Sequence, residues 1–151
     1  MEFTGERLVP DRDDLSDLYY EHVSRYLLAA PFASGKRVLD LGCGCGYGAA
    51  ILADRGAADV VGVDASPEAI GYSRERYARP NARFEVMDAR ALEFPDGAFD
   101  LVVSFEVLEH LGDHERFLDE AARVLAAGGG FLVSTPNVEW TDLSGVRPRR
   151  D

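Results

Sequence analysis

The feature that most constrains the fold of this chain is a glycine-rich segment at residues 38–48, with the sequence VLDLGCGCGYG. Its first four residues favour a β-strand, three alternating glycines follow at Gly42, Gly44 and Gly46, and a helix-compatible run begins at Tyr47. Glycine has no side chain, so the backbone of such a strand-loop-helix turn can approach a ligand closely. The segment therefore predicts a nucleotide-like ligand at this loop.

Strand-like and helical patterns alternate along the rest of the chain. The sequence predicts strands at residues 38–41, 60–63, 83–86, 101–104 and 130–134. It predicts helices at about residues 15–30, 47–55, 67–77 and 113–125, the first stopped by Pro31, the third capped by Ser66 and the last ending in the glycines of residues 128–130. Apolar strands that alternate with helices indicate a parallel sheet with helices on both faces. We expect an α/β fold with a Rossmann-like sheet in the strand order 3-2-1-4-5.

Acidic residues follow the second and third strand-like runs. Asp64 ends the run VVGVD, and Asp88 follows the third run directly after Met87. Ligands of open parallel sheets bind at the carboxyl ends of the strands, where a carboxylate can accept hydrogen bonds from ribose hydroxyls. We expect Asp64 at a ribose and Asp88 at an adenine amino group. Each could instead be a solvated loop residue or a helix cap, which is the commoner role of a loop aspartate.

In order and wording, these segments resemble the motifs of class I S-adenosylmethionine-dependent methyltransferases. VLDLGCGCGYGA resembles motif I of that family, and GVDAS, VMDARAL, FDLVVSFEVLEHL and GGGFLVSTPN resemble its later motifs. The chain is similar to type 11 and type 12 methyltransferase domains, and its N-terminal part to bacterial members associated with glycan biosynthesis genes. The resemblance implies S-adenosylmethionine as cofactor and S-adenosylhomocysteine as product. It implies the cofactor-binding residues Asp40, Gly42, Gly44, Gly46, Asp64, Ala65, Asp88, Ala89 and Ser104.

The resemblance also implies separate roles for these residues. The three glycines would line the methionine moiety, and Asp40 would orient its amino group through the loop. Asp64 would hold the ribose, and Asp88 with Ala89 would border the adenine. The spacing GxGxG differs from the GxGxxG of dehydrogenases, which favours the methyl donor over NAD.

Methyl transfer from a sulfonium requires alignment and exclusion of water rather than a dedicated catalytic triad. A base is needed when an acceptor hydroxyl loses its proton during attack. We expect His110 to be this catalytic residue, with Glu106 and Glu109 as the other nearby candidates.

Glu106, Glu109 and His110 also raise the question of a metal ion. A helical turn would place residues at this spacing on one face, and the pattern resembles the metal-binding ExxEH of O-methyltransferases of the ubiquinone pathway and of small RNA. Many relatives carry EVLEHL without a metal. We therefore expect no metal here, with His110 hydrogen-bonded locally and the glutamates partly solvated.

We expect a single domain over residues 1–151, with an N-terminal helical lid region at 1–36, a core at 37–137 and a tail at 138–151. Related methyltransferases add two further strands after the segment matched by residues 130–135, so this fold is expected to be shortened at its C-terminal side. The fifth strand would then lie at an exposed edge, which favours a homodimer through that edge unless the tail covers it. The sequence therefore supports binding of S-adenosylmethionine better than it supports methyl transfer to an acceptor.

The composition of the chain limits the classes of partner that it can bind. The chain has 27 acidic and 16 basic residues and a net charge of −11, which disfavours nucleic acid as a partner. No stretch approaches the roughly 18 apolar residues of a membrane span, and Cys43 and Cys45 suit a reducing compartment, so we expect a cytoplasmic protein. The favoured function is methylation of an oxygen or nitrogen of a small molecule or sugar. The alternatives are an inactive S-adenosylmethionine-binding module and a small-RNA 2′-O-methyltransferase.

Overall fold

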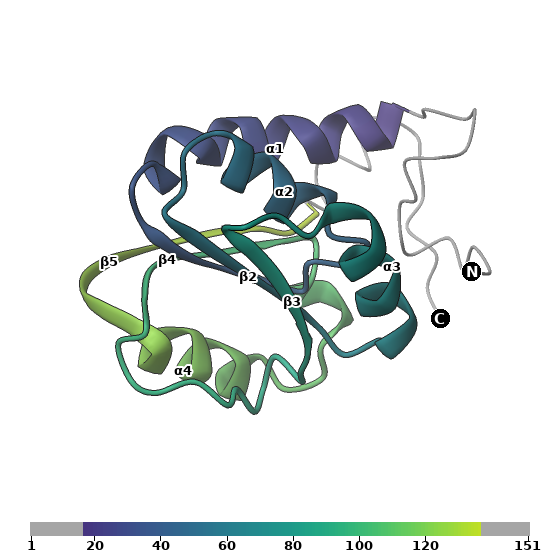
Figure 1. Ribbon diagram of the computed structural model, residues 1–151. Helices are drawn as coiled ribbons and strands as arrows, with labels where there is room; N and C mark the ends of the chain where they lie inside the picture. Colours follow the sequence, from purple (N-terminus) through teal and green to yellow (C-terminus); the bar gives the residue numbers. More distant parts are fainter. Residues whose placement is uncertain (1–16, 137–151) are drawn as a thin grey trace.

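The computed structural model describes residues 17–136 and contains a five-stranded parallel sheet in the order β3-β2-β1-β4-β5 (Figure 1). The strands are β1 (Arg37–Leu41), β2 (Asp59–Asp64), β3 (Ala82–Val86), β4 (Phe99–Phe105) and β5 (Leu125–Ser134). The helices are α1 (Asp17–Ala33), α2 (Tyr47–Asp54), α3 (Pro67–Tyr77) and α4 (His114–Val124), with a short 3₁₀ helix, η1 (Leu108–His110). The predicted fold class and strand order are confirmed. Residues 1–16 of the expected lid region and the expected tail lie outside the described residues.

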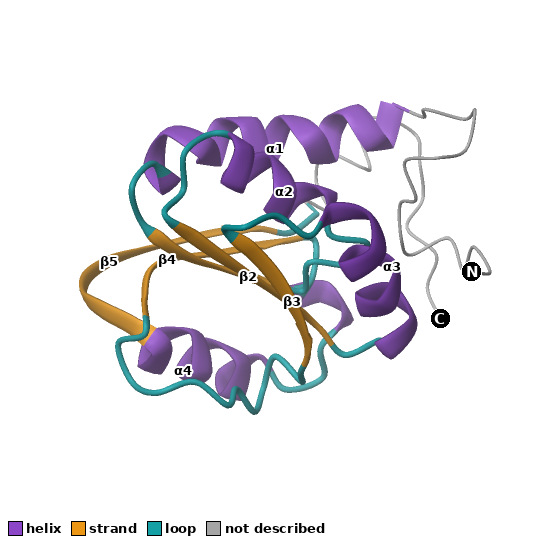
Figure 2. Ribbon diagram, in the orientation of Figure 1, coloured by secondary structure: helices purple, strands orange, loops and turns teal. Residues whose placement is uncertain are grey.

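Both faces of the sheet are covered by helices (Figure 2). Helices α1, α2 and α3 contribute to one apolar core, and α4 contributes to the other. Neighbouring residues of one strand belong to opposite cores: Val38 packs on the α1 side and Leu39 on the α4 side, each with no exposed surface. This double burial is typical of a parallel sheet and explains why the strands are apolar throughout rather than alternating.

One predicted helix end is wrong, and so is the predicted role of one run of glycines. Helix α1 continues past Pro31 to Ala33, because the fixed φ of proline is compatible with a helix and burial of Ala29, Ala30 and Ala33 against the sheet favours the last turn. Helix α4 ends at Val124, and extended backbone begins at Leu125. The glycines of residues 128–130 therefore lie inside β5, where Gly130 pairs with Leu101 beside an irregularity in the β4 ladder.

The predicted third helix and its cap are confirmed. Helix α3 spans the predicted residues, and the Ser66 side chain caps it by accepting a hydrogen bond from the Ala69 amide at 3.2 Å. In the described part of the chain, no helix has the length and apolar character that a membrane crossing needs.

The topology places a binding site at one edge of the sheet. From β1 the chain proceeds outward through β2 and β3, and then returns to the other side of β1 to form β4. Strand order thus reverses between β1 and β4, and ligands of open parallel sheets bind at the carboxyl ends of the strands beside such a reversal.

Candidate functional site

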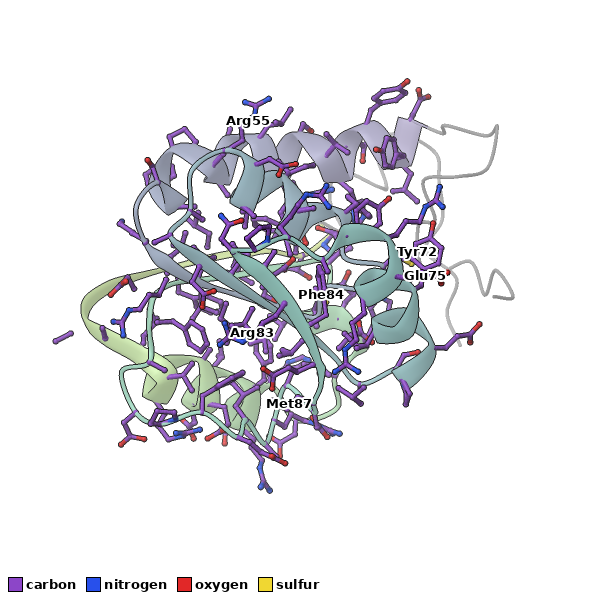
Figure 3. The ribbon with its side chains drawn as sticks, in the orientation of Figure 1. Arg55, Tyr72, Glu75, Arg83, Phe84 and Met87 are labelled. Atoms are coloured by element: carbon purple, nitrogen blue, oxygen red, sulfur yellow. The ribbon has the colours of Figure 1, made fainter. Side chains whose placement is uncertain are left out.

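A cavity of about 350 Å³ lies at the carboxyl ends of β1 to β4. Helix α1, the loop after β1, the end of β2, the loop after β3 and the segment after β4 all line it. Met87, at the end of β3, marks this edge of the sheet in Figure 3. The lining residues are His22, Tyr26, Gly42, Cys43, Gly44, Cys45, Tyr47, Val63, Asp64, Ala65, Met87, Asp88, Ala89, Arg90, Phe105, Glu106, Val107, His110 and Leu111.

Asp64 connects two loops of the cavity. Its Oδ2 accepts a hydrogen bond from the Gly44 amide at 3.0 Å, and its Oδ1 accepts one from the Ser66 amide at 2.9 Å. A carboxylate can accept about four hydrogen bonds, so these two are compatible with further bonds to a ligand. Asp64 therefore holds the glycine loop in place while it faces the cavity.

Gly44 lies where the glycine loop lines the cavity, and the space beside it is open. Its φ is +54°, a left-handed conformation that disfavours a side chain, and a Cβ at this position would have no neighbour within 4 Å. The backbone of the loop is thus exposed to the cavity at a position that a larger residue would obstruct.

Asp40 lies behind the loop rather than in the lining. It is fully buried, and the Tyr26 hydroxyl donates to its Oδ1 and Oδ2 at 3.1 and 3.2 Å. Burial raises the pKa of Asp40 to about 7; the Tyr26 hydrogen bond opposes this increase, and the Asp64 charge adds to it. The Asp40 carboxyl therefore titrates near neutral pH.

Asp88 is engaged by its neighbour Arg90. The Arg90 guanidinium donates to both Asp88 oxygens, Nε to Oδ1 at 3.0 Å and Nη2 to Oδ2 at 2.8 Å, and the Arg90 amide donates to Oδ1 at 2.8 Å. These bonds lower the pKa of Asp88 and keep it ionised. The structure therefore presents an aspartate–arginine pair at the end of the cavity where a single acceptor was expected.

The opposite end of the cavity is formed by α1 and the segment after β4. His22 comes from α1, and Glu106 follows β4 with a left-handed φ of 56°. The Ser134 hydroxyl donates to Glu106 Oε1 at 2.8 Å, and Arg25 Nη2 lies 3.4 Å from the same oxygen. Burial, followed by the Arg25 charge, lowers the pKa of His22, so this imidazole is neutral at physiological pH and can accept a proton.

The segment that carries Glu106, Glu109 and His110 is not the α-helical turn that would place all three on one face. Glu106 precedes the 3₁₀ helix in a left-handed conformation, and a 3₁₀ turn does not align residues as an α-helix does. His110 lines the cavity with 54% of its side chain exposed, and its Nε2 lies 3.8 Å from Glu109. Within residues 17–136, no group of three histidine, cysteine or acidic side chains is arranged to hold a metal ion.

The sequence-predicted cofactor residues divide into two sets. The cavity lining includes Gly42, Gly44, Asp64, Ala65, Asp88 and Ala89. Asp40, Gly46 and Ser104 lie behind it. A Cβ on Gly46 would stand 2.6 Å from the Ser73 hydroxyl, and the buried Ser104 hydroxyl donates to the Leu41 carbonyl at 2.8 Å. These two residues contribute to the packing that supports the loop.

Tyr26, Arg90 and His22 line the cavity but are not among the predicted site residues. His22 and Tyr26 are four residues apart and share a face of α1, which is a helical spacing visible in the sequence. That spacing indicated burial, but it did not show that the face meets the end of β1. Arg90 follows Asp88 by two residues, a spacing at which a side chain can return to the preceding carboxylate.

Comparison with known proteins agrees with this geometry. A family model described as a methyltransferase domain matches residues 39–133. A probable S-adenosylmethionine-dependent methyltransferase of Mycobacterium tuberculosis is 43% identical over 136 residues, which cover 89% of this chain and 48% of the relative. The chain belongs to the class I S-adenosylmethionine-dependent methyltransferases.

Other methyltransferases support this assignment. The ubiquinone biosynthesis O-methyltransferase of Sinorhizobium medicae is 35% identical, over 89% of this chain and 53% of the relative. The crystal structure of an S-adenosylmethionine-dependent methyltransferase from Mesorhizobium loti matches with a TM-score of 0.68 and 29% identity, over 74% of this chain and 51% of that one. The chain spans about half the length of the curated relatives it matches.

Proposed function

We propose that this chain binds S-adenosylmethionine in the cavity and transfers its methyl group to an oxygen or nitrogen of a small molecule or sugar. The observation that carries the proposal is the joint lining of one cavity by the glycine loop, Asp64 and Asp88 at one end and by His22, Glu106 and His110 at the other. An adenosyl ligand is compatible with the first end, because no side chain covers the backbone at Gly44 and Asp64 supplies hydrogen-bond acceptors. The second end provides polar groups for an acceptor.

In this proposal, Gly42 and Gly44 hold the methionine moiety and Asp64 holds the ribose hydroxyls. Asp88 and Ala89 border the adenine, with Arg90 fixing the orientation of the Asp88 carboxylate. Gly46 and Ser104 act indirectly, since both are packed behind the loop. Asp40 acts through the loop on the ammonium group of the ligand.

The bound donor supplies a sulfonium methyl group: the bond from carbon to sulfur breaks, its electron pair stays on sulfur, and the acceptor atom forms the new bond to carbon. The chain aligns the two partners and excludes water from the cavity. An acceptor hydroxyl also needs a base. His110, the residue expected from the sequence, and His22, the more buried imidazole, both line the acceptor end and can take that proton.

The test of this proposal is transfer itself. The protein is incubated with S-adenosylmethionine and a panel of phenols, sugars and amines, and formation of S-adenosylhomocysteine is measured against controls without an acceptor. Acceptor-dependent product supports the proposal. Tight binding of S-adenosylmethionine without transfer to any acceptor would contradict it and support a binding module.

The acceptor class has support from the relatives and from charge. The relative from Sinorhizobium medicae is named for O-methylation in ubiquinone biosynthesis, and a net charge of −11 disfavours a nucleic-acid acceptor. Cys43 and Cys45 are thiols rather than a disulfide, which suits the cytoplasm as the proposed location.

A further inference from the structure

Tyr26 has the largest side chain among the buried residues of helix α1. It is 4% exposed, and its ring packs edge-on against Phe105 at 5.0 Å and against Tyr47 at 6.0 Å between centroids. The space that a Cβ on Gly48 would need is filled by the same ring. Four contacts from three parts of the chain, including the hydrogen bonds to Asp40, thus fix the position of this side chain.

The carboxylate held by Tyr26 lacks a countercharge in the described part of the chain. Between residues 17 and 136, the Asp40 carboxylate accepts hydrogen bonds from the Tyr26 hydroxyl and forms no ion pair with a cationic side chain. A fully buried carboxylate without a cation is costly. Gly42, Cys43 and Tyr26, which adjoin or contact Asp40, all line the cavity, so a cationic group of a ligand bound there would bring positive charge toward this carboxylate.

We propose that Tyr26 is a positioning residue of the donor site, whose hydroxyl holds the Asp40 carboxylate toward the ammonium group of the bound S-adenosyl ligand. This inference rests on the proposed placement of the donor in the cavity. It adds Tyr26 of α1 to the donor site as a residue that orients Asp40, which in turn interacts with the amino-acid end of the ligand.

The groups that face Asp40 come from four elements: Tyr26 from α1, Tyr47 from α2, Cys43 from the glycine loop and Asp64 from β2. Burial raises the pKa values of Tyr26, Tyr47 and Cys43, so these three stay protonated and uncharged near neutral pH. Asp40, in contrast, changes its charge around pH 7. The ionised form attracts an ammonium group, so binding is expected to tighten as the pH rises through this range.

The experiment is a calorimetric titration with S-adenosylhomocysteine, whose ammonium group stays charged over the range used, from pH 6 to 8.5. In the wild-type protein, we expect the Kd to fall by about 5- to 10-fold across this range, with a midpoint near pH 7. In Tyr26→Phe, Asp40 loses its hydrogen bond, its pKa rises, and the midpoint moves up by about one pH unit. Binding at pH 7 is then about fivefold weaker, and it approaches the wild-type value at the alkaline end.

Three controls make the result specific. Tyr20→Phe changes an exposed tyrosine of the same helix and should leave the Kd and its midpoint unchanged. Asp40→Asn should remove the midpoint near pH 7. With 5′-methylthioadenosine, which lacks the amino-acid end, the wild-type protein should show no such midpoint.

The outcomes separate the two proposals. If the wild-type protein binds none of these ligands, the placement of the donor is contradicted. If it binds them and Tyr26→Phe has an unchanged midpoint, or a Kd weakened equally at every pH, the side chain contributes packing alone and the positioning role is overturned.

Discussion

Asp64 shows how a single side chain serves both the fold and the proposed site. One oxygen fixes the glycine loop through the Gly44 amide, and the other fixes the start of α3 through the Ser66 amide. A ligand hydroxyl bound to this carboxylate would therefore meet an acceptor whose orientation is already set.

Replacing this residue should weaken donor binding. Asp64→Ala removes the acceptor for the ribose hydroxyls, and we expect the free energy of S-adenosylmethionine binding to be less favourable by about 1.5–3 kcal/mol, the range for a charge-assisted hydrogen bond. Isothermal calorimetry measures the change. Asp59→Ala, at the other end of the same strand and paired with exposed Arg83, is the control. A wild-type affinity in Asp64→Ala would show that the carboxylate does not contact the ligand.

Gly44 makes a sharper prediction about the loop. Valine is strained at a φ of +54°, and its side chain would enter the open space of the cavity, so Gly44→Val should abolish binding of S-adenosylmethionine. Gly71→Val places the same side chain at an exposed position of α3 and should bind normally. Circular dichroism establishes that both variants fold. Retained binding by a folded Gly44→Val protein is incompatible with the proposed cradle.

The positions of several individual site residues could be predicted from the sequence, and those of others could not. Gly44, Asp64 and Asp88 follow strands directly, so strand prediction places them at the sheet edge. The partner of a side chain depends on which elements meet across the fold. The Tyr26–Asp40 pair joins α1 to β1, and the Ser104 hydroxyl meets a carbonyl of β1. Local patterns contain no information on these contacts.

Among the elements, all five strands of the sheet were predicted, because apolar β-branched runs buried on both faces are distinctive. The transition from α4 to β5 was not predicted. The glycines of residues 128–130 suggested a break between the helix and a strand starting at residue 130, but extended backbone begins at Leu125 and the glycines lie within β5, which pairs with β4. Tertiary contacts here outweigh the local preference of glycine.

The segment after β4 makes a prediction about metals. Glu106 accepts a hydrogen bond from Ser134 and lies beside Arg25, and Glu109 is close to Thr135, so these carboxylates already have partners from other elements. We expect Mg²⁺ and Mn²⁺ to leave the melting temperature of the protein with bound S-adenosylmethionine unchanged. Any ligand of the native state should raise that temperature. A metal-dependent rise that is lost in Glu109→Ala would contradict this and favour a metal-assisted O-methyltransferase.

For the whole molecule, β5 is the outer strand of the described sheet on one side and carries Phe131, Leu132 and the 46% exposed Val133. Outer strands with apolar residues tend to associate unless something covers them. We predict that the 151-residue chain forms a dimer through this edge. Light scattering at several concentrations measures the mass of the particle.

A charged residue tests the proposed interface. Val133→Lys should shift the protein toward a monomer, because lysine on an outer strand opposes pairing. Leu28→Lys, which changes a residue of α1 that is 74% exposed, should not. A wild-type protein that stays monomeric at high concentration rules out the dimer and leaves coverage by the chain itself as the alternative.

We propose the cavity at the carboxyl ends of β1 to β4 as the donor site. Titration of the wild-type protein with S-adenosylmethionine, NAD and ATP under identical conditions tests it most directly. We predict one site for S-adenosylmethionine, with S-adenosylhomocysteine competing for it, and no comparable binding of NAD or ATP. Binding of NAD or ATP in preference to S-adenosylmethionine would contradict the account.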